Sequence, residues 1–176
     1  MNPISLYFLS FFLKILPVSR CFRLKNVLLN KCGINISSTA RIYSNIRIYG
    51  NGELTIGEDT FIGHEAMIIC SNPSKVNIGS CVDIAPRVYI GTGSHEIEPE
   101  SKHIAGKGVS KNIEIGDGTW IGANSSILPG VKIGKKVVIA AGSLVSNDIP
   151  SYTIAAGIPA EPIKEWNKEK EIWESI

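Results

Sequence analysis

Aliphatic residues recur at every sixth position along most of this chain. Starting from Ile115, each sixth position is aliphatic up to Val145, without a break. A period of six matches neither the period of about 3.6 of an amphipathic helix nor the period of two of a half-buried strand. The same period runs through two earlier stretches, with a slip of four residues across 71–74. The positions are Ile36, Ile42, Ile48, Leu54, Ile56, Ile62, Ile68, Ile78, Ile84, Ile90, Ile115, Ile121, Ile127, Ile133, Ile139 and Val145.

The hexads predict an all-β fold, a parallel β-helix shaped as a triangular prism. Each hexad supplies one short strand, three strands close one turn, and stacked turns lie about 4.8 Å apart with the aliphatic residues pointing inward. The regular hexads make about five turns, which bury a core only by stacking on one another. Glycine follows seven of the aliphatics, and we expect it to let the backbone turn each corner. These are Gly57, Gly63, Gly79, Gly91, Gly116, Gly122 and Gly134.

The repeat is interrupted by an insertion at residues 92–112. It holds two of the three histidines, His95 and His103, together with three acids, three lysines and three glycines. Insertions in solenoids form loops on one face, which is often the binding face. A neutral imidazole can accept the proton of an attacking hydroxyl, so His95 is a candidate general base. For His103, contact with an acceptor and simple solvation both stay open, and we expect His64 to be structural or exposed.

The two ends of the chain lie outside the repeat. Residues 1–32 are predicted to form an apolar, amphipathic helical segment that Pro17 interrupts, and its apolar run of about 13 residues is shorter than the roughly 20 that span a bilayer. This segment either packs on the body or lies on a membrane surface with its basic residues toward the headgroups. Residues 33–150 form the coil, and 151–176 a Gly/Pro-rich turn and a capping helix over 161–173. The basic residues are Lys14, Arg20, Arg23 and Lys25.

Composition narrows the classes of function. The 176 residues correspond to one domain, and 18 Lys and Arg against 16 Asp and Glu give no electrostatic footprint for nucleic acid. The cysteines, at positions 21, 32, 70 and 81, form no CxxC pair, and no Cys/His spacing suits zinc. We therefore expect no metal, and free thiols in a reducing compartment such as the cytoplasm.

Several motifs resemble the hexapeptide-repeat acyltransferases, in the branch similar to maltose acetyltransferase that includes many polysaccharide O-acetyltransferases. The resemblance covers about residues 33–165. It implies a left-handed coil, an exception to the right-handed rule for parallel crossovers. It also implies acetyl-CoA as the donor, a saccharide hydroxyl as the acceptor, and a homotrimer with active sites between subunits. We expect a cytoplasmic protein, and in one interpretation its N-terminal segment contacts the cytoplasmic face of a membrane. The motifs are Val82-Asp83-Ile84-Ala85-Pro86, Gly91-Thr92-Gly93-Ser94-His95-Glu96, Ala105-Gly106-Lys107-Gly108, Ile115-Gly116-Asp117-Gly118-Thr119-Trp120-Ile121-Gly122-Ala123, Ile127-Leu128-Pro129-Gly130-Val131, Ala140-Ala141-Gly142-Ser143 and Ala156-Gly157-Ile158-Pro159-Ala160.

The resemblance also assigns roles to single residues. His95 matches the catalytic histidine of the family. Ser146-Asn147 replaces the Thr-Lys of many relatives, and Glu161 replaces a basic residue. We therefore expect Lys164 to bind the CoA phosphates, and Lys135, Lys136 or Lys168 could replace the missing cations. The positions that match the CoA-binding region are Trp120, Gly122, Ala123, Ala141, Gly142, Ser146, Asn147 and Lys164.

A carboxylate would help to orient the imidazole of His95, as in catalytic triads. Asp83 and Glu96 are the candidates. Asp83 lies two hexads before His95 on another face, so it would orient a neighbouring subunit's histidine across a trimer interface. Alternatively, Asp83 is a solvated residue at a corner of the coil without a catalytic role. Trp120 either packs on the coil or forms a wall for the pantetheine arm or the sugar.

Other functions remain as alternatives. The acceptor could be an amino sugar or a small non-sugar molecule. A metal enzyme similar to the γ-class carbonic anhydrases needs three converging histidines, and the hexad registers of His64 and His95 differ. A serine acetyltransferase carries a larger N-terminal helical domain than 30 residues supply. A non-catalytic scaffold would leave the histidine insertion without a role.

Overall fold

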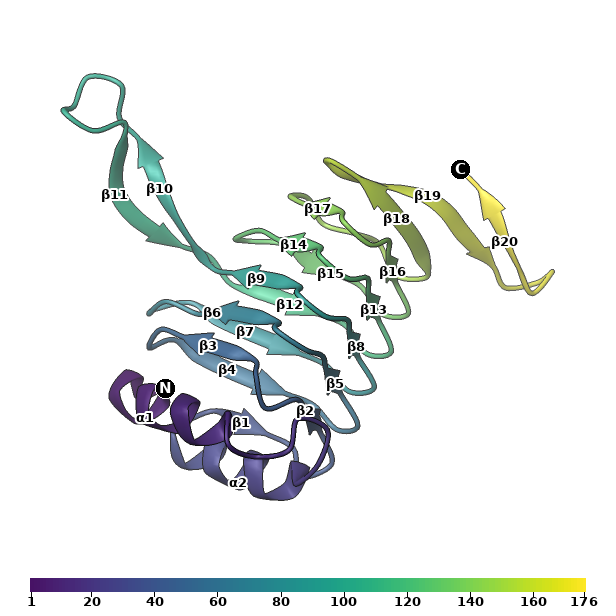
Figure 1. The fold of residues 1–176 in the computed structure, drawn as a ribbon. Coiled ribbons are helices and arrows are strands. Elements are labelled where there is room, and N and C mark those ends of the chain that lie inside the picture. The colour runs from purple at the N-terminus through teal and green to yellow at the C-terminus, as the bar shows by residue number, and fades with distance from the viewer.

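The computed structural model describes residues 1–176 as a three-sided parallel coil (Figure 1). Each side is a parallel sheet, which we call face A, B or C in chain order. Face A has five strands, so the coil has five turns, as the hexads predict. The strands of face A are β1 (Asn35–Ile36), β4 (Glu53–Ile56), β7 (Lys75–Ile78), β12 (Ile113–Ile115) and β15 (Lys132–Ile133); of face B, β2 (Arg41–Ile42), β5 (Phe61–Ile62), β8 (Asp83–Ile84), β13 (Trp120–Ile121), β16 (Val138–Ile139) and β18 (Thr153–Gly157); and of face C, β3 (Arg47–Tyr49), β6 (Met67–Ile69), β9 (Tyr89–Gly91), β14 (Ser126–Ile127) and β17 (Leu144–Val145).

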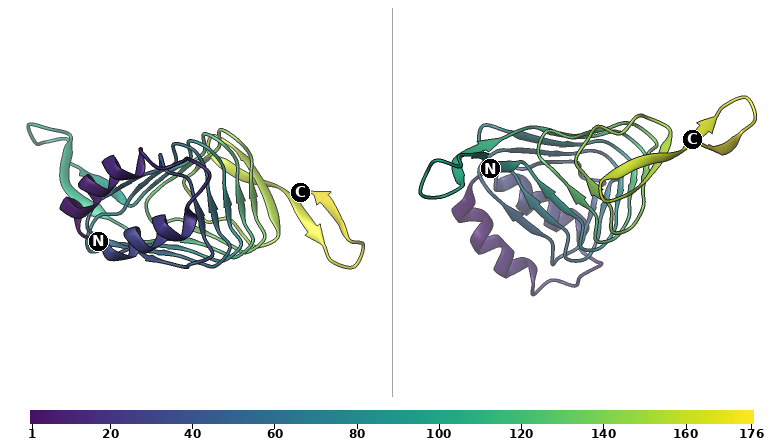
Figure 2. Two further views of the ribbon diagram at one scale, coloured as in Figure 1. Left: turned by 60° about the horizontal axis from the view of Figure 1, so that its bottom comes forward. Right: turned by 90° about the horizontal axis from the view of Figure 1, so that it is seen from above.

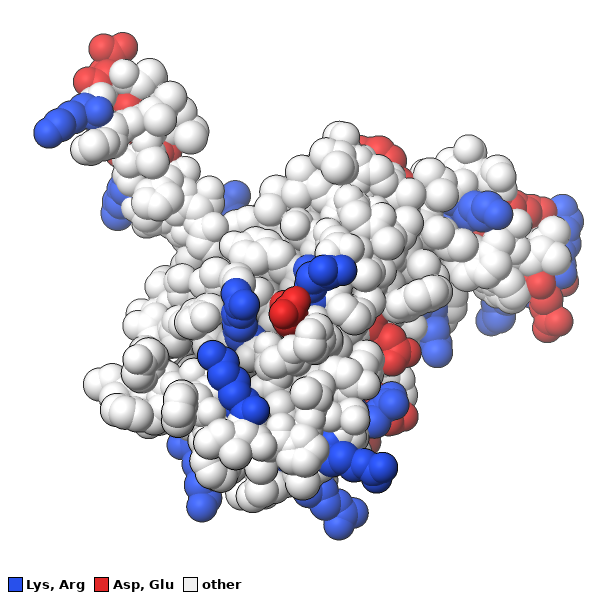
Figure 3. All heavy atoms as spheres, viewed as in Figure 1, with Lys and Arg blue, Asp and Glu red and all other residues white.

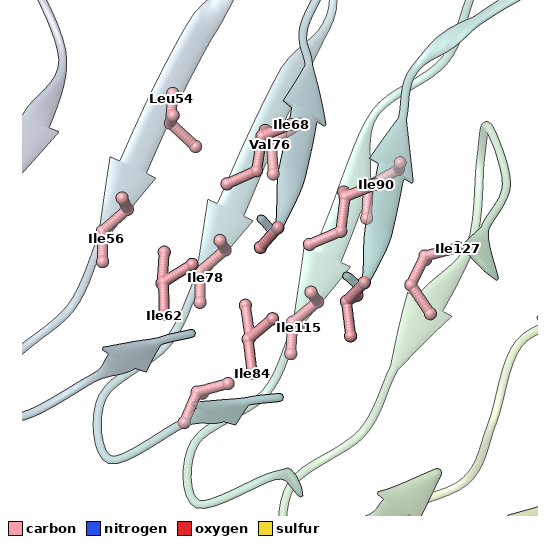
Figure 4. Packing of buried hydrophobic residues seen from close by; sticks show 14 of the residues in the cluster. Leu54, Ile56, Ile62, Ile68, Val76, Ile78, Ile84, Ile90, Ile115 and Ile127 are labelled. Atoms are coloured by element: carbon pink, nitrogen blue, oxygen red, sulfur yellow. The ribbon is translucent and has the colours of Figure 1, made fainter. Parts of the chain in front are cut away.

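The predicted aliphatics stack in columns inside the prism (Figure 4). On face B, Ile42, Ile62, Ile84, Ile121 and Ile139 are register partners from one turn to the next, and each is fully buried. Faces A and C carry equivalent columns. The hexad register is therefore confirmed, because a shift by one residue would turn every column toward solvent.

Glycine is needed after the aliphatics for a different reason from the one that the sequence indicated. Gly57, Gly116, Gly122 and Gly134 do not have a positive φ. A Cβ on Gly116 would lie 2.6 Å from the Gly134 carbonyl, and the others are equally close to the next turn. Other residues adopt the left-handed conformation at the corners, among them Asp59, Cys81, Arg87, Asn124 and Lys136. The prediction that these glycines turn the corner was wrong: they let adjacent turns approach.

Two helices cover the N-terminal end of the coil (Figures 1 and 2), namely α1 (Pro3–Leu13) and α2 (Phe22–Lys31). Leu6, Leu9 and Leu13 of α1 are buried and belong to the main core. The prediction that Lys25 faces lipid headgroups was wrong. Its side chain is completely buried, and its ammonium group donates to the carbonyls of Pro17 (3.0 Å), Val18 (2.7 Å) and Ile42 (3.3 Å).

The insertion at 92–112 is a projecting β-hairpin, made of β10 (Gly93–Ile97) and β11 (Ala105–Ser110) (Figure 1). It leaves the prism at the edge where face C passes to face A. The four-residue slip at 71–74 lies at the same edge one turn earlier, where the amide of Ser71 donates to the hydroxyl of Thr92 (2.9 Å). All irregular corners thus gather on one edge of the prism, and the repeat stays intact elsewhere.

The predicted C-terminal helix over 161–173 was wrong. Residues after the coil form β19 (Ala160–Asn167) and β20 (Ile172–Ser175), which extend face B by antiparallel pairing and project as an arm (Figure 2). The last parallel strand, β18, would otherwise expose unpaired backbone groups at the sheet edge. Trp166 and Trp173 pair across the arm with ring centroids 5.3 Å apart, a contact typical of strands.

Candidate active site

His95 lies in a groove of about 260 Å³ between the hairpin and the edge of the prism. It is on β10, and the hairpin returns Val109, Ser110 and Lys111 to the same groove. The opposite wall comes from the corners of the next two turns. The lining residues are Ser94, His95, Val109, Ser110, Lys111, Leu128, Pro129 and Ser146. Of the residues expected to bind the cofactor, Ser146 is therefore the one that shares a groove with His95.

The ring of His95 is oriented by the backbone of its own hairpin. Its Nδ1 atom lies 2.8 Å from the carbonyl oxygen of Gly106 on β11. A carbonyl oxygen can only accept, so Nδ1 must carry the proton in this contact. A neutral His95 then has its lone pair on Nε2, which is the arrangement that a general base needs.

No carboxylate of this chain hydrogen-bonds His95. Glu96 follows on the same strand without contacting the ring, and Asp83 lies on β8 in another face of the prism. Nδ1 is already occupied by the Gly106 carbonyl, so the expectation that a carboxylate orients the imidazole is not met within the chain. In the sequence, only the Gly-x-Gly pattern of the insertion marked Gly106. The approach of its carbonyl to His95 depends on the register of the hairpin.

Asp83 and Trp120 meet on face B, in a hollow of about 320 Å³. They are register partners on β8 and β13, and Phe61 lies beside them on β5. Trp120 is 54% exposed, so it does not pack into the core. The carboxylate of Asp83 is 4.0 Å from the guanidinium group of Arg41. The structure thus brings two predicted site residues together, on a side of the prism away from His95.

The remaining predicted cofactor residues occupy two further places. Gly122, Ala123, Ala141 and Gly142 lie at the edge between faces B and C, where the Gly142 amide donates to the Ala123 carbonyl (2.8 Å). Lys164 lies exposed on β19 opposite Ile154, while Asn147 follows Ser146 at the edge near the hairpin. A single chain therefore does not gather the predicted residues into one site.

Lys111 is a groove residue that the sequence analysis did not single out. It is the last cation of the insertion, and its backbone amide donates to the Thr92 carbonyl (2.9 Å), which closes the base of the hairpin. The sequence could have indicated Lys111 by its position, because it lies where the hexads resume after the insertion. Lys135, one of the predicted substitutes, is instead 3.3 Å from the carboxylate of Asp117.

The cysteines do not take part in the groove. Cys32 and Cys70 are buried, and burial raises the pKa of both thiols, which keeps them protonated. Cys21 and Cys81 are exposed and unpaired. The structure also has no group of three or more His, Cys, Asp or Glu side chains arranged to hold a metal ion.

A larger groove lies elsewhere, between α1 and face C. Its volume is about 610 Å³, and its charged lining residues are Lys14, Arg47 and Glu65. We place the candidate active site at the smaller groove, because that groove contains the oriented imidazole and the larger one contains no histidine.

Comparison with known proteins identifies the architecture. The family model described as "Bacterial transferase hexapeptide (six repeats)" matches residues 112–147. The structure of a maltose O-acetyltransferase from Clostridium difficile 630 superimposes with a TM-score of 0.70 at 28% identity, covering 95% of this chain and 87% of that one. Residues 112–147 thus carry the hexapeptide repeats of this family, and the chain as a whole is similar to a maltose O-acetyltransferase that has the same fold. The fold of this chain is accordingly the left-handed parallel β-helix of that family.

Two further relatives of this hexapeptide-repeat protein have named activities or ligands. The galactoside O-acetyltransferase of Escherichia coli K12 is 39% identical over 128 residues, covering 70% of this chain and 56% of that protein. A galactoside acetyltransferase solved in complex with coenzyme A has a TM-score of 0.74 at 26% identity, covering 96% and 82% of the two chains. This chain spans about half to two thirds of the length of the curated relatives it matches.

Proposed function

We propose that this protein transfers an acetyl group from acetyl-CoA to a hydroxyl group of a saccharide, with His95 as the general base. The observation that carries the proposal is the contact between His95 Nδ1 and the Gly106 carbonyl, which leaves Nε2 free to accept a proton. The groove that His95 lines also holds Ser146, a position that matches the CoA-binding region of the family.

The reaction requires one proton to move twice. As the acceptor oxygen attacks the thioester carbonyl carbon, its proton passes to Nε2 of His95. As the carbon–sulfur bond breaks, the imidazolium returns that proton to the sulfur, which leaves as the free thiol. His95 thus ends the cycle neutral. Backbone N–H groups of the neighbouring corners can stabilise the oxyanion that forms between the two steps.

A saccharide acceptor is supported by the relatives, whose names specify a galactoside and maltose as the molecules they act on. A cytoplasmic position would give the protein its acetyl-CoA and keep its four thiols reduced. The cysteine environment agrees with a direct transfer, because neither buried thiol is a thiolate that could take up the acetyl group.

We propose that the complete site forms between subunits of a homotrimer. In one chain His95 and the pair Asp83–Trp120 lie on different sides of the prism, so both can serve one site only if neighbouring chains supply them. The hairpin carries few buried side chains, and an isolated two-stranded hairpin is marginally stable in water. A neighbouring prism would cover it and place Asp83 and Trp120 beside the acceptor.

The phosphates of CoA need cations at the rim of this site. Lys164 on the C-terminal arm and Lys111 in the groove form no ion pair within the chain, so both are available to hold phosphate. Ammonium groups bind phosphate as point charges and tolerate varied geometry.

The first experiment measures release of free thiol from acetyl-CoA against a panel of acceptors. The panel contains a galactoside, maltose, an amino sugar and a small non-sugar alcohol. His95→Ala is expected to lower kcat/KM by about 100- to 10,000-fold, the usual contribution of a general base. The matched control is His64→Ala, since His64 is also exposed but lies on the coil beside Asn45. Unchanged thiol release in His95→Ala would refute the assignment.

The second experiment tests the position of the site. His95→Ala and Trp120→Ala, each weakly active alone, are co-expressed and purified as mixed oligomers. If a site takes His95 from one chain and Trp120 from its neighbour, some sites in the mixture hold neither substitution, and part of the activity returns. If both residues serve sites within single chains, the mixture stays as inactive as its components.

A further inference from the structure

The outer face of α1 is a surface of large apolar side chains. While Leu6, Leu9 and Leu13 pack inward, the opposite side of the same helix is 46–75% exposed. A helix that is apolar on all sides is normally covered on all sides, and a contiguous apolar patch marks an interaction site. We call this patch the outer α1 surface. Its residues are Ile4, Tyr7, Phe8, Phe11 and Phe12 of α1, and Ile15 just after the helix.

The charge of the N-terminal segment, residues 1–52, is of one sign. The first 52 residues hold seven Lys or Arg and no Asp or Glu, whereas the remaining 124 hold 11 and 16. Lys14, Arg20, Arg23 and Lys31 are exposed on the two helices and the segment that joins them, and Lys25 is buried. Figure 3 shows blue but no red side chains on the lowest part of the molecule, where Figure 1 places the helices, and side chains of both colours on the hairpin and the C-terminal arm. A partner that complements the helical end therefore carries both negative charge and apolar groups.

The large groove beside α1 continues this surface. Its walls include Tyr7 and Lys14 from the helix and Arg47 and Tyr49 from face C, with Glu65 as its one acid. At about 610 Å³ it can admit a polar headgroup next to the apolar patch. Two cations and two aromatic rings at the border of an apolar face are typical of a helix that lies at a membrane interface.

We propose that the helical end of this protein docks on a membrane surface rich in anionic phospholipid, with α1 lying in the interface plane. The apolar side chains enter the boundary of the acyl chains, and the four exposed cations face the phosphates. No helix in the structure is long and apolar enough to cross the bilayer. The hairpin with His95 and the C-terminal arm point away from the helical end (Figure 1), so docking leaves the groove open. This inference does not depend on the proposed acetyl transfer.

A second copy of the chain is a weaker candidate for this surface. A symmetric contact through α1 would bring Lys14, Arg20 and Arg23 toward their own copies. No acid of the first 52 residues could compensate them there. Like charges at an interface oppose association, whereas anionic lipid neutralises the same cations.

Flotation of the purified protein with vesicles tests the proposal. One set of vesicles is pure phosphatidylcholine, and the other is an equal mixture of phosphatidylcholine and phosphatidylglycerol. We expect at least about tenfold more protein bound to the anionic vesicles, given the attraction of four surface cations. Salt should weaken this preference, because the cations are exposed.

Two pairs of substitutions separate the apolar contribution from the charge. Phe8→Glu with Phe11→Glu is expected to lower binding at least about tenfold by removing inserted rings and adding repulsion. Its matched control is Ile158→Glu with Ile176→Glu, at equally exposed sites near the other end, which should bind normally. Arg20→Gln with Arg23→Gln should weaken binding to anionic vesicles without changing binding to phosphatidylcholine.

Other readouts keep the outcomes distinct. The Phe8 and Phe11 substitutions should leave thiol release with a water-soluble acceptor unchanged, because neither residue lies near His95. Thermal unfolding checks that each variant is folded. Equal binding to both kinds of vesicle, or no binding to either, would overturn the proposal. A change of oligomeric state in the Phe8 and Phe11 variant, without a change in vesicle binding, would assign the surface to a second copy instead.

Discussion

Three glycines allow the two reasons for glycine in this coil to be measured separately. Gly116 has an ordinary φ, but a Cβ there would lie 2.6 Å from the Gly134 carbonyl of the next turn. Gly142 has a φ of +73° and nothing within 4 Å of its Cβ position. Gly108 has neither constraint. Gly116→Ala therefore tests the close approach of two turns, and Gly142→Ala tests backbone strain. Gly108→Ala is the control that tests neither.

The cost at Gly116 follows from the geometry. Ordinary contact begins at 3.4 Å, so the two turns must separate locally by about 0.8 Å. The hydrogen bond from the Gly116 amide to the Ile133 carbonyl, now 2.9 Å, would then be lost. Overpacking costs about 1–3 kcal/mol and the lost bond about 1 kcal/mol, so we expect Gly116→Ala to lose about 2–4 kcal/mol of unfolding free energy.

The two controls give smaller effects. Gly142→Ala should cost about 1–2 kcal/mol, because alanine is strained in the left-handed region. Gly108→Ala should stay within about 0.5 kcal/mol, as for most exposed positions. For a chain of this size each kcal/mol shifts Tm by about 2–4 °C, so Gly116→Ala should melt about 5–15 °C below Gly108→Ala.

Thermal unfolding followed by circular dichroism measures these differences, at one protein concentration because assembly contributes to Tm. If Gly116→Ala melts together with Gly108→Ala, adjacent turns can separate freely and the close-approach argument is refuted. If Gly142→Ala is the more damaging of the two, backbone conformation dominates, as the sequence alone had indicated.

Two further predictions concern charged side chains. Lys25→Met should lose about 2 kcal/mol of stability in urea unfolding, because three carbonyls lose their donor, while exposed Lys31→Met should be neutral. Burial lowers the pKa of Lys25 in the folded protein. Between that lowered pKa and 10.5, the unfolded chain therefore binds more protons than the folded one. The stability of the wild type relative to Lys25→Met should accordingly increase as pH rises toward 10.5. The Ser80 amide and the Lys135 ammonium group hold the pKa of Asp117 below its usual value. Its contribution is therefore present above pH 3.8 and lost as pH falls through the lowered pKa. Thermal melts should show the difference between wild type and Asp117→Asn shrinking in that acid range, and a constant difference would contradict this assignment.

The site was predictable only in part. The break in the hexads located the insertion, and the family resemblance named His95 within it. The partner of His95 was not predictable, because the Gly106 carbonyl reaches Nδ1 only through the register of a hairpin whose turn the sequence does not specify. Lys111, Leu128, Pro129 and Ser146 line the groove because corners from three successive turns stack on one edge.

The sequence by itself determined the coil. A six-residue period of aliphatics buries the repeated aliphatic side chains together in a three-sided coil, and the register of all three faces follows from it, whereas the hand of the coil came from the family resemblance. Tertiary structure decided the rest. Residues 161–173, which were predicted as a capping helix, became strands because the last turn offered an unpaired sheet edge. Lys25 went inward because carbonyls of two distant segments converge on its ammonium group, and a convergence of backbone atoms leaves no pattern in the side chains.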